Sequence, residues 1–201
     1  MTPFLAAAFM MFPLNQAQPQ VIWPDFVVTR SEWGAKPALD FAKPHSISLI
    51  TIHHGGVASN PKRSLEDKLR GLQSWSQRAD KLSSGKEKPA WVDIPYHVYI
   101  SVDGRVGEAR PWNLAGDTNT EYNPTGHFLI VLEGNFEVER VPSAQWESLV
   151  KMTAWAAKTF SVSWDKIEGH DDHSSQTTCP GKDLKRQLPR LRSMVRRELS
   201  R

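Results

Sequence analysis

The stretch SISLITIHH, Ser46–His54, consists mostly of apolar and β-branched residues and ends in two histidines. A short apolar stretch of this kind predicts a buried strand. A second stretch, HFLIVLEGNF (His127–Phe136), is hydrophobic at both odd and even positions. That pattern is typical of a central strand that is covered on both faces. Together the two stretches predict the centre of a sheet.

Three segments outside these strands have helical periodicity. Ser64–Ala79 places leucines at 65, 69 and 72 on one face, which continues at Trp75 or Ser76, and Ser64 is a natural N-cap. Ser143–Phe160 has apolar residues at helical spacing. A last helix begins after Gly181, and Pro189 predicts a kink or a break within it.

A hairpin is predicted around Asp103-Gly104, because this dipeptide lies between the strand-like segments Tyr96–Ser101 and Arg105–Ala109. The polar segment Asp80–Ala90 contains Gly and Pro and predicts a loop. Strands that alternate with helices and include one hairpin predict an α/β fold, with a central mixed β-sheet flanked by helices.

The chain has 201 residues, of which 39% are hydrophobic and 23% charged, as expected of one soluble globular domain. The segment 182–201 contains eight basic and two acidic residues, a net charge of +6, which leaves −3 of the overall +3 for the rest. This basic segment could contact an anionic polymer such as cell wall or nucleic acid, or it could be a solvated helix face. We expect no nucleic-acid partner.

The N-terminal segment is apolar from Phe4 to Phe12, which is too short to span a bilayer as a stable helix. It resembles the hydrophobic region of a secretory signal with cleavage after Ala17, although no Lys or Arg precedes it. We therefore predict a signal peptide and short linker over 1–25 and one folded domain over 26–201. The mature protein would be periplasmic or extracellular, without an integral membrane segment. It would be cytoplasmic if the segment is not a signal.

Three polar clusters lie at predicted strand ends or in loops, where functional sites are usually built. They are His53-His54, Tyr96-His97, and the stretch GHDDHSSQTTCPG (Gly169–Gly181), which includes the only cysteine, Cys179. Two imidazoles and one thiolate would hold Zn²⁺ and leave a fourth position for water. The plainer interpretation is that each histidine is an ordinary polar residue and Cys179 a small buried hydrophobic one. Spacing alone leaves both interpretations open.

Four motifs in this chain resemble, in order, those of the zinc-dependent N-acetylmuramoyl-L-alanine amidases, which share a fold with phage T7 lysozyme and the peptidoglycan recognition proteins. TRSEWGAKP (29–37) is similar to the entry motif of the family, and ITIHHGG (50–56) to its first metal strand. IPYHVYISVDGRVGEARPWN (94–113) is similar to its tyrosine hairpin, and Gly169–Gly181 to its closing metal loop. The resemblance covers Thr29 to Leu184 and implies the fold of that family.

The resemblance also implies a ligand set for one zinc ion per chain: His53, His170 and Cys179. His54 and His173 are then not ligands, and His54 is expected to line or orient the substrate site. Tyr96 matches the tyrosine that faces the reacting carbonyl oxygen. Asp171 departs from the arginine that usually follows the ligand histidine, so the salt bridge of that arginine is not expected here.

Further residues are assigned by position in the motifs. Glu133 matches a glutamate of muropeptide amidases and is either the general base or a residue that orients a ligand. Thr177 occupies the position of a catalytic lysine in some members and is expected to assist the oxyanion. Arg110, Trp112 and Asn113 fall in the segment that lines the substrate groove of the family, and we expect them to contact substrate.

The resemblance implies an amidase that hydrolyses the bond between N-acetylmuramic acid and L-alanine in peptidoglycan, and we expect it to be exported and monomeric. The alternative is a non-catalytic peptidoglycan-binding protein of the same fold. Binders of this kind typically replace the cysteine ligand, so the presence of Cys179 favours the enzyme. A fold that acts through protein partners is a third possibility, for which the basic C-terminal helix is the only indication.

Overall fold

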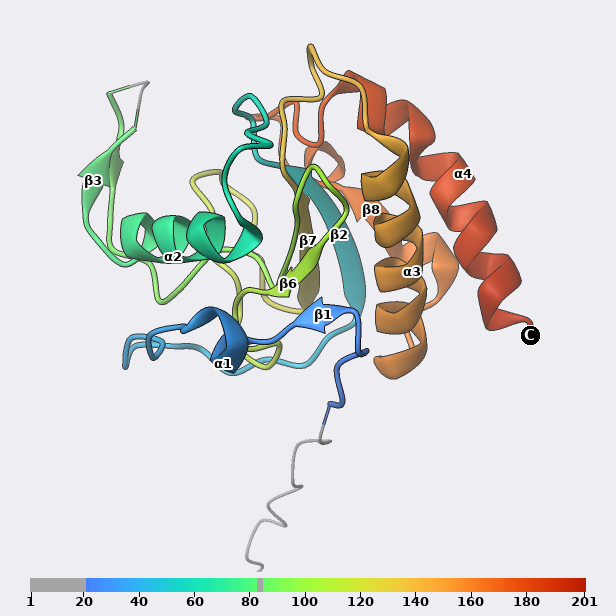
Figure 1. Cartoon of the computed structure of the whole chain (residues 1–201), viewed down its shortest axis with the longest axis horizontal. Helices are drawn as coiled ribbons and strands as arrows, with labels where there is room; N and C mark the ends of the chain where they lie inside the picture. Colours follow the sequence, from blue (N-terminus) through green and yellow to red (C-terminus); the bar gives the residue numbers. More distant parts are fainter. Residues whose placement is uncertain (1–20, 83–84) are drawn as a thin grey trace, which may run out of the picture.

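The computed structural model describes residues 21–82 and 85–201 of the chain (Figure 1). The predicted signal sequence lies almost wholly outside these residues. Trp23, which the prediction placed in a linker, stacks on Trp155 with ring centroids 4.8 Å apart. The packed part of the chain therefore begins before the predicted boundary at Phe26. No helix in the described ranges has the length and apolar character needed to cross a membrane.

Six strands form a mixed sheet, as predicted. In spatial order they are β1 (Val27–Val28), β6 (Val106–Glu108), β5 (Val98–Ile100), β7 (His127–Leu132), β2 (Leu49–His54) and β8 (Ile167–Gly169). The β5–β6 pair is antiparallel, whereas the other neighbours in this sheet are parallel. The two stretches that predicted the centre of the sheet, β2 and β7, pair along their whole length, with His53 opposite Val131.

The turn between β5 and β6 contains the predicted Asp-Gly pair. Gly104 has a φ of +87°, and a Cβ there would lie 2.7 Å from the carbonyl oxygen of Ala144. Only glycine fits this turn, because it tolerates positive φ and lets the hairpin approach the start of the next helix.

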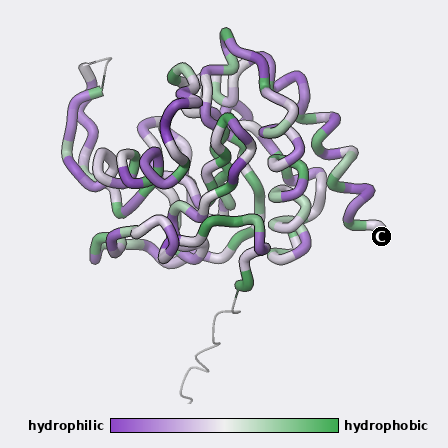
Figure 2. Tube along the Cα trace, viewed as in Figure 1, coloured by the Kyte–Doolittle hydropathy of each residue, from purple (hydrophilic) through white to green (hydrophobic). Residues whose placement is uncertain are grey.

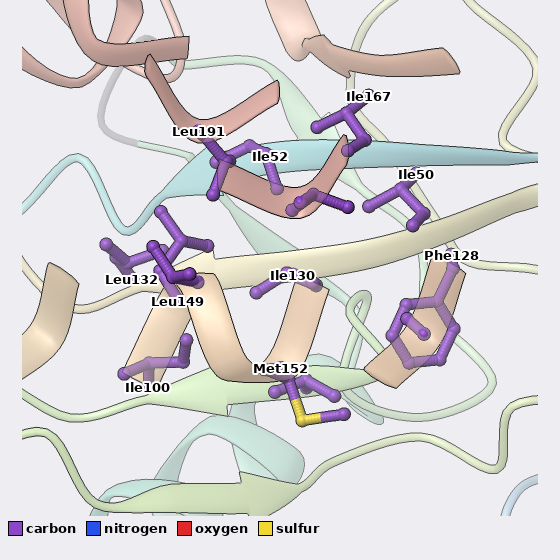
Figure 3. Packing of buried hydrophobic residues seen from close by; sticks show 14 of the residues in the cluster. Ile50, Ile52, Ile100, Phe128, Ile130, Leu132, Leu149, Met152, Ile167 and Leu191 are labelled. Carbon is purple, nitrogen blue, oxygen red and sulfur yellow. The ribbon is translucent and has the colours of Figure 1, made fainter. Parts of the chain in front are cut away.

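One face of the sheet is covered by α3 (Ser143–Thr159) and α4 (Lys182–Leu199), which lie side by side (Figure 1). Their apolar sides pack against Ile50, Ile52, Ile130 and Leu132 of the central strands (Figure 3). In Figure 2 the hydrophobic colour follows the central strands, while α4 alternates between hydrophobic and hydrophilic positions. Of the two outcomes predicted at Pro189, a kink or a break, the break does not occur: α4 is continuous there, and its four core-facing side chains are buried. Losing one backbone hydrogen bond to proline is offset by this burial.

The opposite face carries the short helix α1 (Arg30–Trp33) and α2 (Leu65–Ser76). Its hydrophobic cluster is smaller and includes Trp33, Leu65, Leu69, Tyr99 and Val131. Side chains alternate between faces along a strand, so Val131 and Glu133 face α2 while Ile130 and Leu132 face α3. Ser64 caps α2 as predicted by accepting a hydrogen bond from the Asp67 amide.

The segment predicted as a loop over Asp80–Ala90 contains a short antiparallel hairpin, β3 (Asp80–Lys81) and β4 (Glu87–Lys88). Its strands are only two residues long and polar, so hydrophobic periodicity gave no signal for them. The hairpin projects beside α2 (Figure 1).

Most basic side chains of α4 contact groups of this same chain. Lys185 pairs with Asp171 and Asp172, and Arg186 pairs with Asp183. The guanidinium groups of Arg190 and Arg196 lie over the rings of Trp146 and Trp164. These contacts fit the interpretation of the C-terminal charge as a solvated helix face.

Candidate metal centre and active site

His53, His170 and Cys179 meet at the end of β2. One potential ligand atom from each side chain lies within 4.8 Å of the other two, and all three residues are buried. The Sγ atom of Cys179 is 3.6 Å from Nδ1 of His53, and the two imidazole rings are 4.7 Å apart. The structure therefore brings together the three side chains that the sequence predicted as zinc ligands.

Strand pairing explains how these distant residues meet. Ile52 of β2 is opposite Gly169 of β8, so His53 and His170 follow at the same edge of the sheet. His170 begins the short 3-10 helix η2 (His170–Asp172), and the loop then returns until the Asp171 amide donates to the Cys179 carbonyl at 2.7 Å. Gly181 ends the loop with a φ of +86°, and a Cβ there would lie 2.6 Å from the Phe136 carbonyl carbon. A side chain at this position would push the cysteine loop away from the sheet.

The chemistry of the three side chains suits a zinc ion. Burial lowers the pKa of His53 and lowers that of His170 to about 4, so both rings are neutral and can act as ligands. Burial raises the pKa of the Cys179 thiol to about 12, although the His54 amide donates to its sulfur at 3.4 Å. A thiolate is costly there unless a cation compensates it, and a divalent metal would do so.

Two further features fit a metal centre. Nε2 of His170 is hydrogen-bonded to the Thr120 hydroxyl at 2.9 Å, which leaves Nδ1 as the nitrogen available to a metal. Such a bond from the second ring nitrogen fixes the orientation of ligand histidines. Nε2 of His53 is buried and has no hydrogen-bond partner among the residues that the structure describes, so it is free to bind a metal.

Three predicted site residues line the same small cavity of about 230 Å³ as the three ligands: His54, Tyr96 and Thr177. Nδ1 of His54 accepts a hydrogen bond from the Phe136 amide at 3.1 Å, so its Nε2 carries the proton. Burial raises the pKa of Tyr96, whose ring is 5.0 Å from that of His53, so its hydroxyl remains a donor. The Thr177 hydroxyl accepts from the Cys179 amide at 3.1 Å and keeps its own proton to donate.

A larger cavity of about 500 Å³ adjoins the first and shares with it Gly55, Trp91, Pro95, Tyr96 and Asn119. Its other lining residues come from α2, from the loop after β2, and from the ends of β5 and β7. Since they share these lining residues, the two cavities are neighbours, and we refer to them together as the groove, which extends from the metal ligands to α2. A groove with a few convergent polar groups is typical of a substrate site.

Glu133 lines the larger cavity, and its carboxylate is almost fully buried. Oε2 accepts hydrogen bonds from Lys68 Nζ at 2.7 Å, from the Ser101 hydroxyl at 3.1 Å and from the Val102 amide at 2.9 Å. Oε1 accepts from the Asn60 amide at 2.8 Å. These four donors hold the carboxylate between α2, β5 and the loop after β2.

The residues predicted to contact substrate from the segment 110–113 lie elsewhere. Arg110 is fully buried, and its guanidinium donates to the carbonyls of Asp93, Ile94 and Ala115 and to the Asp117 carboxylate. Trp112 packs on the main core and on Phe160, with ring centroids 5.4 Å apart. Neither these two nor Asn113 lines the groove. This placement argues against their contact with substrate and assigns Arg110 to holding its loop.

The closing loop departs from the family pattern at Asp171 and His173, and the structure places a charged side chain beside each of them. Asp171 and Asp172 both accept from Lys185 Nζ, at 2.7 and 2.6 Å, so this lysine of α4 anchors the loop from outside. Nε2 of His173 lies 3.1 Å from a Glu168 oxygen and is not part of the ligand set. This distance places His173 beside β8, and its exclusion from metal binding stays a prediction.

Sequence reasoning missed several residues of the groove. Lys68 falls within a predicted helix without an assigned role, and Trp91, Thr120 and Tyr122 were assigned to no element or site. The Tyr122 ring lies 4.8 Å from that of His170. One signal was available in the sequence: Lys68 lies on the helix face formed by Leu65, Leu69 and Leu72. A lysine on such a face is buried in the fold and needs a partner.

Comparison with known proteins agrees with this geometry. A family model described as N-acetylmuramoyl-L-alanine amidase matches residues 43–182. Mouse peptidoglycan recognition protein 1 is 32% identical over 164 residues, which cover 79% of this chain and 84% of the relative. The structure of Drosophila peptidoglycan recognition protein SD is similar with 27% identity and a TM-score of 0.65, covering 81% of this chain and 92% of that one.

The amidase LysC of Clostridium intestinale is 22% identical with a TM-score of 0.63, covers 87% of this chain and 97% of its own, and supports the fold alone. The matched residues 43–182 include all three clustered side chains. This chain belongs to the N-acetylmuramoyl-L-alanine amidase family, which shares its fold with the peptidoglycan recognition proteins.

Proposed function

We propose that this protein is a zinc-dependent amidase that hydrolyses the bond between the lactyl group of N-acetylmuramic acid and L-alanine in peptidoglycan. The observation that carries the proposal is the complete ligand trio of His53, His170 and Cys179 at the head of a substrate-sized groove. A zinc ion held there would supply a Lewis acid for the scissile carbonyl and an activated water at neutral pH.

The residues around the trio can then position and stabilise the reacting amide. The Tyr96 hydroxyl, kept protonated by burial, donates a hydrogen bond to the carbonyl oxygen as negative charge develops on it. The Nε2–H of His54 and the Thr177 hydroxyl are two more donors on the wall of the same cavity. No lysine is present at position 177, so these neutral donors take its place.

The general-base role of Glu133 stays a prediction. Its four hydrogen bonds favour a supporting role, in which it ties the loop after β2 to α2 and so shapes the groove. Glu133→Gln separates the roles: a proton acceptor loses most of kcat when replaced, whereas a supporting residue loses stability and retains kcat.

The alternative, a peptidoglycan-binding protein without catalysis, would use the same groove. The intact cysteine ligand supports the enzyme, because a binding role does not require it. We further propose that the protein is exported and acts as a monomer, since peptidoglycan lies outside the cytoplasm.

The decisive experiment is digestion of purified peptidoglycan followed by mass spectrometry of the new termini, with metal analysis of the same protein. We expect about one zinc per chain and new L-alanine amino termini, both lost in Cys179→Ala. Stable binding of peptidoglycan without new termini would instead identify the binding protein.

A further inference from the structure

A buried lysine of the β3–β4 hairpin packs against the end of α2. Lys88 is the last residue of β4, and only 1% of it is exposed. Its Nζ donates hydrogen bonds to the carbonyls of Ser76, Arg78 and Pro89 at 3.1, 2.6 and 3.0 Å. In the described part of the chain, no carboxylate forms an ion pair with it.

The carbonyls that Lys88 binds belong mainly to the end of α2. Ser76 is the last residue of that helix, Gln77 is its C-cap, and Arg78 comes next along the chain. The last carbonyls of a helix have no partner within the helix and carry partial negative charge. The last turn of α2 contains no basic residue of its own. The hairpin therefore supplies the cation that the helix end lacks.

The same ammonium group lies against two tryptophans. Nζ is 4.7 Å from the ring centroid of Trp75 and 4.6 Å from that of Trp91, within the range of a cation–π contact. The two rings are perpendicular, with centroids 5.4 Å apart. Lys88 is thus the shared partner of both rings, one from α2 and one from the segment after the hairpin.

Both tryptophans line the groove. Trp75 and Trp91 border the larger cavity, and Trp91 also borders the cavity that holds the metal ligands. The hairpin has a second link to this wall, because Lys86 Nζ donates to the carbonyl of Asn119 at 2.6 Å, and Asn119 borders both cavities. The orientation of the aromatic wall therefore depends on a hairpin that does not itself line the groove.

We propose that Lys88 is a positioning residue for substrate, which fixes the Trp75–Trp91 wall so that the groove is preformed next to the metal ligands. This inference rests on the proposed function of the groove in binding muropeptides. Indole rings that are already fixed lose little conformational freedom on binding, and this increases affinity. Lys88 does not touch the reacting atoms, so its effect is on binding and not on the chemical step.

The test compares Lys88→Met, which keeps the aliphatic stem and removes the charge, with Lys81→Met as a matched control. Lys81 lies on the same hairpin, is exposed and pairs only with Glu87. With a purified disaccharide-tetrapeptide as substrate, Lys88→Met should raise KM about tenfold and leave kcat within about twofold, as expected when uniform binding is lost. Lys81→Met should match the unsubstituted protein. An unchanged KM, or a loss confined to kcat, overturns the inference.

Binding is measured separately by titration calorimetry with the same muropeptide on the Cys179→Ala background. If the unsubstituted protein releases no L-alanine termini, the proposed function fails, but a weaker affinity of the Lys88→Met form still supports the role of Lys88. Near-ultraviolet circular dichroism should show a smaller tryptophan signal in that variant. If Lys88→Met does not fold, Lys88→Gln takes its place, because glutamine retains hydrogen-bond donors without the charge. This variant should raise KM less than Lys88→Met would. An unchanged KM in Lys88→Gln overturns the inference equally.

Discussion

The two faces of the sheet are built differently, although the same strands form both. The face under α3 and α4 is a continuous apolar core, in which Ile50, Ile130 and Leu132 are fully buried. The face under α2 has fewer apolar residues and contains a groove, a buried Lys68–Glu133 pair and the three metal-site residues at its edge. The well-packed face stabilises the fold, so the other face can hold polar groups at a cost in stability.

The largest effect is expected from removing the thiol. Cys179→Ala should lower hydrolysis of peptidoglycan by about a thousandfold or more, because both the Lewis acid and the activated water are lost with the metal. Zinc analysis should show loss of the ion. The far-ultraviolet circular dichroism of the protein should stay unchanged, because the packed face keeps its helices. Thr178→Ala, an exposed neighbour, is the control. Normal turnover by the Cys179→Ala variant would contradict the proposed mechanism.

The polar face should be sensitive to loss of half of its buried ion pair. Lys68 and Glu133 are 2.7 Å apart with 6% of each side chain exposed, so Lys68→Met leaves a carboxylate buried without its cation. We expect a loss of about 3–5 kcal/mol in the free energy of unfolding, measured by urea denaturation. The double variant Lys68→Met/Glu133→Leu should recover only part of that loss, because the Asn60 and Val102 amides then lose their acceptor. A single variant as stable as the unsubstituted protein would show that the pair is dispensable.

Tyr96→Phe probes the donor beside the metal ligands without disturbing either core. Losing one hydrogen bond to the developing oxyanion should lower kcat by about a hundredfold, with zinc content and stability retained. Tyr99→Phe is the control, because that ring borders the larger cavity and not the one that holds the ligands. Equal losses in both variants would argue against a specific role of the Tyr96 hydroxyl.

The smallest effect is expected from replacing Thr120, which orients the proposed metal ligand His170. Thr120→Val removes the hydrogen bond to Nε2 of His170 and should weaken zinc affinity about tenfold. Competition with a chelator measures this affinity directly. Thr125→Val, an exposed residue of the same segment, should leave it unchanged. An unchanged affinity in Thr120→Val would mean that strand pairing alone orients His170.

Much of this molecule could be predicted from local sequence. The strands β2 and β7, the helices α2, α3 and α4, and the Asp-Gly turn follow from hydrophobic period, caps and turn residues, which act over a few positions. The ligand trio came from the resemblance of the motifs, and the structure brings its members together. The structure argues against the groove contacts assigned to Arg110 and Trp112, because proximity in a motif does not show whether a side chain turns toward solvent or into the core.

Hydrophobic period and turn residues specify the mixed sheet and its apolar face, and the motifs name the residues able to hold a metal. Which polar groups meet on the other face follows from the packing of distant segments. Lys68 and Glu133 are 65 positions apart, and Thr120 and His170 are 50 apart. Lys88 meets its two tryptophans only through the packing of the hairpin on α2. Hydrophobic periodicity records which face is buried, whereas the pairing of buried polar groups depends on strand register and loop paths that no local pattern encodes.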